Sequence, residues 1–128
     1  MPLVIHIPET DSTNNYIKKL LPFQDIEEGT IVYTDFQTAG KGQRGNTWEA
    51  ERGMNLTFSI VFYPNILYAN EQFIISQIVS LAVTDILNKY TDDVSIKWPN
   101  DIYWKEKKIC GILIENSLEG DRIKESVC

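Results

Sequence analysis

Hydrophobic residues along the chain follow two different spacings, and the changes of spacing predict where strands and helices lie. Short apolar runs rich in β-branched and aromatic residues are typical of strands when turn-forming residues flank them. Spacings of three and four residues predict helices. The predicted strands cover residues 3–7, 30–36, 55–63, 94–98, 102–104, 109–115 and 122–128. The predicted helices are a short one that starts within 11–15 and ends at Pro22, and a longer one over 71–90.

The order of these elements favours an α+β fold. Strands cluster in hairpins and the helices are set apart, whereas a parallel α/β sheet needs regular alternation. Pro8 is expected to end the first strand, because proline cannot donate to a strand ladder. A length of 128 residues fits one domain, and 43% hydrophobic with 23% charged residues excludes a disordered or low-complexity chain.

Charge and cysteine content narrow the function classes. Twelve basic residues against 18 acidic ones give a net charge of -6, which disfavours duplex DNA as the main ligand. Cys110 and Cys128 form no CxxC pair and do not suit a secreted disulfide scaffold, so a cytoplasmic location is expected. No signal peptide is expected, and every apolar stretch is broken before the roughly 18 residues that span a membrane.

A glycine-rich segment follows the predicted strand 30–36. In this segment, QTAGKGQRG, Gly40, Gly42 and Gly45 let the backbone approach a ligand, while Lys41 and Arg44 add positive charge. The spacing fits neither a Walker A loop nor a Rossmann fingerprint. A flexible hairpin loop is the alternative interpretation.

Two further segments carry candidate chemistry. Lys97 and Asp101 flank the turn in KWPND, where a cation and a carboxylate could hold an anion and Mg²⁺ together; a turn with solvated lysines is the alternative. The DSTNN segment over 11–15 fits the N-cap of a helix and also fits a neutral, hydrogen-bonding ligand. His6 is the only histidine and lies in an apolar strand, which argues against Ser-His-Asp or His-metal chemistry.

Together and in this order, these segments resemble the catalytic domain of biotin–protein ligases. The matching parts are the S-T-N triplet at 12–14, the glycine loop from Gln37 to Trp48, and KWPND followed by K-x-x-G at Lys108 and Gly111. The resemblance covers essentially the whole chain. No DNA-binding helix-turn-helix precedes it, so it implies the ligase-only class. The implied fold is a mixed, largely antiparallel sheet with flanking helices, similar to class II aminoacyl-tRNA synthetases.

The resemblance implies a two-step acyl transfer that uses ATP and Mg²⁺, with biotin as substrate. Biotin and ATP would form biotinyl-5′-AMP and pyrophosphate. A lysine of the biotin carboxyl-carrier protein of acetyl-CoA carboxylase would then accept the biotinyl group. No DNA or membrane partner is expected, and a homodimer is compatible with the resemblance.

The resemblance also implies roles for individual residues. Catalytic roles fall on Lys108, Arg44 and Lys97; ATP binding on Arg44, Asn55, Lys97 and Asn100; and Mg²⁺ binding on Asp101. Biotin binding falls on Ser12, Thr13, Asn14, Gln37, Gly40, Lys41, Gly42, Gln43, Trp48, Lys108 and Gly111.

Two departures from the family pattern qualify these expectations. Many members have arginine at the positions of Lys41 and Gln43, so retention of the adenylate is expected to depend on Arg44. Members also continue past the position of Cys128, so residues 1–128 are expected to form a C-terminally incomplete catalytic domain. Two alternatives are a lipoate–protein ligase and a non-catalytic module that binds biotin without transferring it.

Overall fold

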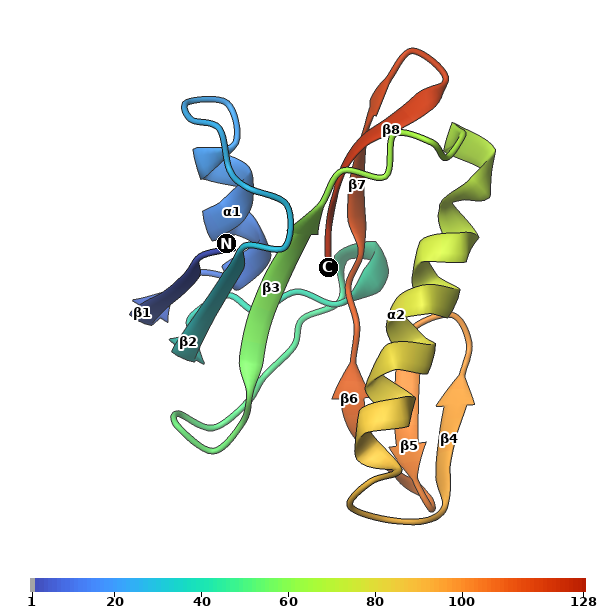
Figure 1. Ribbon diagram of the computed structural model, residues 1–128. Helices are drawn as coiled ribbons and strands as arrows, with labels where there is room; N and C mark the ends of the chain where they lie inside the picture. The colour runs from blue at the N-terminus through green and yellow to red at the C-terminus, as the bar shows by residue number, and fades with distance from the viewer. Residues whose placement is uncertain (1) are drawn as a thin grey trace.

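Two sheets carry the fold of residues 2–128, which are described by a computed structural model (Figure 1). The first sheet has the order β1-β2-β3-β8-β7, built from β1 (Val4–Thr10), β2 (Ile31–Gln37), β3 (Thr57–Phe62), β8 (Arg122–Val127) and β7 (Glu115–Glu119). The second has the order β4-β5-β6, built from β4 (Val94–Lys97), β5 (Asp101–Trp104) and β6 (Lys107–Gly111). The helices are α1 (Thr13–Leu20) and α2 (Gln72–Leu87), with 3₁₀ turns η1 (Gln43–Gly45) and η2 (Ala69–Glu71).

The predicted α+β class is confirmed, because the strand pairs are antiparallel except for β1 with β2. That parallel pair positions the candidate site. The carboxyl ends of β1 and β2 meet at one sheet edge, where Thr10 pairs with Gln37. The contact continues past the strands, since Thr38 N donates to Thr10 O at 2.9 Å and Ala39 N to Asp11 O at 2.9 Å. The start of α1 and the glycine-rich loop therefore lie side by side.

Helix α1 packs its apolar face on the first sheet. Ile17 is fully buried, and the core around it consists of Val32, Val61 and Val127. The predicted N-cap is confirmed, because the Ser12 hydroxyl accepts the Asn15 N–H at 3.0 Å. The core thus fixes the helix over the sheet and places its N-terminus at the carboxyl edge of β1 and β2.

Helix α2 confirms the longer predicted helix, which ends at Leu87 rather than at 90. It lies along β4 and β5 of the second sheet (Figure 1). Near its start, the ring of Phe73 meets Trp98 edge-on, with centroids 5.7 Å apart. In residues 2–128, neither α-helix is both long and apolar enough to cross a membrane.

Three strand predictions are wrong in their bounds. Pro8 lies within β1 instead of ending it, which an edge strand tolerates where the proline nitrogen faces away from the neighbouring strand. The predicted strand 109–115 is two strands: β6 ends at Gly111 in one sheet, and β7 begins at Glu115 in the other. Trp98 follows β4 rather than ending it, and 45% of its surface is exposed.

Candidate functional site

The S-T-N triplet and Gln37 meet where α1 begins. The backbone N–H of Thr13 donates to Gln37 Oε1 at 2.9 Å, and Thr13 Oγ1 lies 3.3 Å from the same oxygen. A backbone nitrogen can only donate, so this contact fixes which way the Gln37 amide points. Gln37 Nε2 consequently faces away from the helix and can donate to a ligand.

Behind this contact lies a buried hydrogen-bond network. Thr13 Oγ1 is 2.6 Å from the hydroxyl of Ser59, and that hydroxyl donates to Asn14 Oδ1. Asn14 Nδ2 donates to Leu113 O at 3.3 Å and to Glu115 Oε1 at 3.2 Å. Asn14 is 6% exposed, so its amide group holds the protein together here. Its direct contact with biotin stays a prediction.

Ser59 is missing from the site residues predicted from the sequence. The available signal was its place on β3, where it shares the buried face with Val61. A lone hydroxyl on an apolar strand face must find a hydrogen-bond partner, because an unpaired buried polar group is costly. Such a serine is a candidate for an ordered network.

The glycine-rich segment forms a small hairpin after β2. Trp48 N donates to Gly40 O at 2.9 Å, and Gly42 N donates to Asn46 O at 2.7 Å. A Cβ at Gly40 would lie 2.2 Å from the Trp48 carbonyl oxygen and 3.0 Å from Gln37 Nε2. Gly40 is therefore required by the close approach of two backbone segments. A Cβ at Gly42 would meet Asn46, lying 3.2 Å from its Cβ and 3.6 Å from its carbonyl oxygen.

Lys41 ties this hairpin to the rest of the site. Its ammonium donates to Asn15 Oδ1 at 2.7 Å and lies 3.2 Å from Glu115 Oε1, while Lys18 reaches the other Glu115 oxygen at 2.8 Å. Burial acts to raise the pKa of Glu115, but hydrogen bonds from Lys18, Asn14 and Lys41 outweigh it, so the pKa lies below its ordinary value. Glu115 is thus an ionised hub between α1, the hairpin and β7. Sequence reasoning missed it, although a carboxylate directly after the apolar run 112–114 was a usable signal.

The second arm of the hairpin, which carries Trp48, packs on β6. A Cβ at Gly111 would lie 2.9 Å from Trp48 Cζ3, so the indole ring packs directly on the Gly111 backbone. The ammonium of Lys108 lies 4.8 Å from the centroid of the Trp48 ring and 2.7 Å from Asp101 Oδ1. The structure thereby brings together the glycine loop and the K-x-x-G strand, which are far apart in sequence.

The KWPND residues line up across the second sheet. Lys97 pairs with Asp101, and Asp101 pairs with Gly111, in the registers of β4, β5 and β6. The Lys97 ammonium lies 5.8 Å from the ring centroid of Tyr103. Asn100 Nδ2 donates to Ile112 O at 3.0 Å, so this side chain also closes the turn onto the strand beyond β6. Its ATP-binding role stays a prediction.

Three predicted residues lie apart from this cluster. Gln43, Arg44 and Asn55 are exposed, and within residues 2–128 no side-chain hydrogen bond or ion pair connects them to the other predicted site residues. Arg44 sits at the hairpin tip with φ 51° and ψ 44°, in the left-handed region. Their assigned roles require either the ligand itself or movement of the hairpin tip.

The site has limited capacity for a metal ion. Residues 2–128 contain no group of three or more His, Cys, Asp or Glu side chains placed to hold one. Asp101 offers one carboxylate, already paired with Lys108. Mg²⁺ commonly binds one or two carboxylates together with substrate phosphates. Asp101 therefore fits Mg²⁺ only beside a bound phosphate group.

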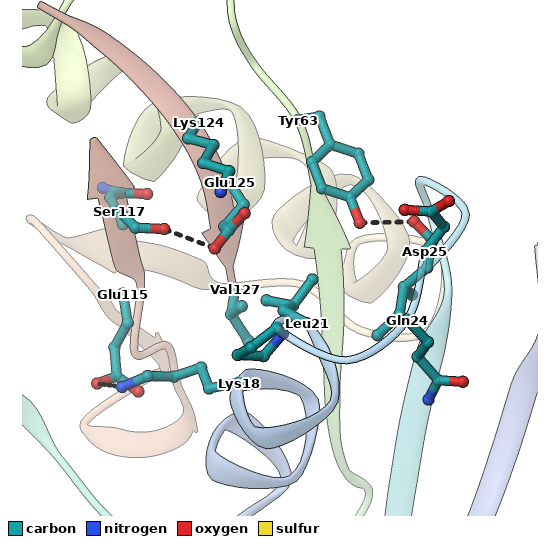
Figure 2. Close-up of a pocket in the computed structure, with 13 residues that line it drawn as sticks. Lys18, Leu21, Gln24, Asp25, Tyr63, Glu115, Ser117, Lys124, Glu125 and Val127 are labelled. Atoms are coloured by element: carbon teal, nitrogen blue, oxygen red, sulfur yellow. Dashed lines mark hydrogen bonds and ion pairs between the residues drawn. The ribbon is translucent and has the colours of Figure 1, made fainter. Parts of the chain in front are cut away.

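A hollow of about 890 Å³ lies elsewhere, between the end of α1 and strands β7 and β8 (Figure 2). It contains Glu115 but none of the site residues predicted from the sequence. Ser117 and Glu125 pair within it at 2.8 Å, and burial there raises the pKa of Tyr63. The three predicted segments therefore do not meet in this hollow.

Beside Gln37 and Trp48 the open space is only about 10 Å³, which is about the volume that one water molecule needs. This space is also lined by Asp35, Phe36 and Thr57, and neither Thr13 nor Gly111 borders it. It is therefore not the place where the three predicted segments meet.

Comparisons with known proteins agree with this arrangement. The model of the biotin/lipoate A/B protein ligase family matches residues 6–128. The bifunctional ligase/repressor BirA of Escherichia coli is 32% identical over 115 residues, covering 85% of this chain and 33% of that protein. The biotin–[acetyl-CoA-carboxylase] ligase of Paracoccus denitrificans is 32% identical, covering 92% of this chain and 49% of its own length.

A solved structure gives the same result for the fold. The biotin protein ligase of Aquifex aeolicus, in complex with biotin and ATP, has a TM-score of 0.74 and 30% identity, covering 99% of this chain and 51% of that one. The chain thus spans about a third to a half of the length of these relatives. Because the family model matches nearly every residue and the fold is the same, the chain belongs to the biotin/lipoate A/B protein ligase family.

Proposed function

We propose that this chain activates biotin with ATP and transfers the biotinyl group to a protein lysine. The observation that carries the proposal is the meeting of three separate segments at one place. Thr13 and Gln37 form its polar end, and Trp48 on Gly111 forms an apolar wall beside Lys108. The family match and the biotin and ATP bound by the Aquifex aeolicus relative support the same ligands here.

The polar end suits the ureido ring of biotin. This ring carries N–H donors and a carbonyl acceptor, so it needs both kinds of partner. Gln37 Nε2 is available to donate, and Thr13 Oγ1 lies next to it. Ser12, the backbone of Lys41 and Gly111, and the close approach allowed by Gly40 and Gly42 would complete this end. Gln43 is the remaining hairpin residue that we assign to biotin.

The charged end suits the chemistry of activation. Joining biotin to ATP brings a carboxylate against an α-phosphate, so fixed positive charge stabilises the transition state more than a general base would. Lys108 is held at the site between the Asp101 carboxylate and the Trp48 ring. We assign it to the carboxylate and α-phosphate, with Arg44 and Lys97 assisting at the phosphates.

The remaining assignments complete the ATP side. Asn55 and Asn100 would contact the nucleotide. Asp101 would hold Mg²⁺ together with the phosphates, and the ion would supply further positive charge to the leaving pyrophosphate. The proposed acceptor is the biotin carboxyl-carrier protein of acetyl-CoA carboxylase in the cytoplasm, a choice supported by the name of the Paracoccus denitrificans relative.

ATP–pyrophosphate exchange tests the proposal, because it reports adenylate formation without an acceptor protein. Exchange that depends on biotin supports it. Exchange that depends on lipoate instead would move the chain to the lipoate branch of the same family. Absence of exchange, combined with thermal stabilisation by biotin, would leave a binding module. Ligand at 100 times its dissociation constant adds about 2.7 kcal/mol to stability, which a melting curve detects.

A further inference from the structure

We propose that Ser59, held by Asn14 and Glu115, fixes the direction of the Thr13 hydroxyl and so makes this site selective for a ring N–H. The inference rests on the proposed function, which it deepens by naming a specificity-determining network behind the ligand.

The orientation of the Asn14 amide comes first. Its Nδ2 faces three acceptors: Leu113 O at 3.3 Å, Glu115 Oε1 at 3.2 Å and Val127 O at 3.5 Å. Turning the amide over would aim its oxygen at two carbonyls and a carboxylate. Glu115 is ionised, because its hydrogen-bond donors outweigh the effect of burial and keep its pKa below the ordinary value. The Asn14 oxygen is therefore locked toward Ser59.

The hydroxyl of Ser59 comes next. A hydroxyl carries one proton, and Asn14 Oδ1 can only accept, so the Ser59 hydroxyl donates its hydrogen bond to Asn14. Ser59 then has only lone pairs to offer to Thr13. The two hydroxyl oxygens are 2.6 Å apart, a separation that requires a proton between them. That proton must come from Thr13.

The consequence appears at the ligand-facing end. The Thr13 hydroxyl has one proton and two oxygens within its reach, Ser59 Oγ at 2.6 Å and Gln37 Oε1, to which it could also donate, at 3.3 Å. The much shorter contact with Ser59 takes the proton, so the Thr13 oxygen has only lone pairs to offer on the side of Gln37. Gln37 Oε1 already accepts the Thr13 backbone N–H and also has a lone pair left. Two acceptors at this spacing fit an N–H donor of a ligand ring and repel an acceptor. A dithiolane ring such as that of lipoate offers no N–H, so the network disfavours it.

The discriminating probes are biotin and two cyclic carbamate analogues, in each of which one ureido N–H is replaced by a ring oxygen. Calorimetric titration of the whole chain measures the dissociation constants. The wild-type chain should bind at least one analogue much more weakly than biotin, because ring oxygen then faces the Thr13 oxygen. In Ser59→Ala the Thr13 proton is released and can turn toward the ring oxygen. The biotin-to-analogue affinity ratio should fall by about tenfold, equivalent to about 1.4 kcal/mol.

Two control variants separate an effect on the orientation of the Thr13 hydroxyl from a general disturbance of the buried structure. Ser59→Thr keeps the hydroxyl and should keep the wild-type ratio. Ser126→Ala removes an equally buried hydroxyl from neighbouring β8, outside the network, and should also leave the ratio unchanged. Melting curves establish that each variant is folded before titration.

The outcomes distinguish this inference from the proposed function. Equal weakening of biotin and both analogues in Ser59→Ala would mean a structural role only, and would overturn the inference. Wild-type affinities that do not differ between biotin and either analogue would also overturn it. If the wild-type chain binds no biotin, the proposed function itself fails.

Discussion

Gly40→Ala is the substitution whose effect the structure specifies most closely. The added Cβ would lie 2.2 Å from the Trp48 carbonyl oxygen, far inside normal contact distance, and 3.0 Å from Gln37 Nε2. Carbon–oxygen contacts of this kind are normally about 3.3 Å or longer, so the two sides of the hairpin must separate by about 1 Å. That separation strains or breaks the 2.9 Å hydrogen bond from Trp48 N to Gly40 O.

The size of the effect follows from these two changes. Overpacking costs roughly 1–3 kcal/mol, and a lost hydrogen bond adds about 1 kcal/mol. The free energy of unfolding should fall by about 2–4 kcal/mol. Gly42→Ala is the matched stability control in the same hairpin, because its Cβ would lie 3.2 Å from Asn46 Cβ and 3.6 Å from Asn46 O, much less close than the 2.2 Å contact at Gly40. Its cost should stay below about 1 kcal/mol.

Urea unfolding followed by tryptophan fluorescence measures both variants, and titration with biotin measures the site. Gly40→Ala should lower the urea midpoint with an unchanged slope, and should weaken biotin binding, because Gln37 Nε2 and Trp48 are displaced. Gly42→Ala should be close to wild type in the urea midpoint. If the two variants were equally stable, or if Gly40→Ala bound biotin as wild type does, the close approach in this hairpin would not have the role argued here.

Three further predictions follow from charged and nucleophilic groups. Lys108→Ala should lower biotin-dependent pyrophosphate exchange by about 10²–10³-fold with little change in melting temperature. The control is Lys107→Ala, which changes an exposed neighbour and should exchange at the wild-type rate. Equal exchange rates in all three proteins would contradict the role of Lys108. The hydrogen bond from the Ser12 backbone N–H lowers the pKa of Asp11 to about 2. The stability that this carboxylate contributes is therefore present above its ordinary pKa of about 3.9 and is lost as the pH falls toward 2. The difference in urea midpoint between wild type and Asp11→Asn should shrink over that pH range. Burial raises the pKa of the Cys110 and Cys128 thiols. Iodoacetamide should therefore modify both cysteines slowly at pH 7 and much faster in urea. Fast labelling of the folded chain would contradict their burial.

The sequence predicts the elements that depend on local signals. The cap at Ser12, the helix over 72–87 and the glycine hairpin all follow from short-range patterns, and the structure has each of them. The division of 109–115 between two sheets could not be predicted, because it depends on which distant strand each half pairs with. The packing of Trp48 on Gly111 is equally long-range.

The site residues also divide into those that a local motif predicts and those that only long-range contacts reveal. The S-T-N triplet, Gln37 and Lys108 are recognisable because each belongs to a motif with a fixed spacing. Ser59 belongs to no motif; its place on an apolar strand face marks it only as a buried hydroxyl that needs a partner, and its contact with Thr13 identifies that partner. Gln43, Arg44 and Asn55 match the family pattern, but their exposed side chains gain a role only with a ligand, so their function stays a prediction.

The run from β6 into β7 explains how one stretch of chain holds both arms of the hairpin. Lys108 and Gly111 on β6 contact Trp48, while Glu115, four residues past Gly111, holds Lys41. Lys41 and Trp48 lie close together at the base of the hairpin, because Trp48 N donates to Gly40 O and Lys41 pairs with Thr47. The ring contact and the ion pair therefore restrain the same end of the hairpin and leave its tip, with Arg44, outside both contacts. Glu115 also orients Asn14, so the same carboxylate anchors the hairpin and the hydrogen-bond network on which the ligand ring would rest.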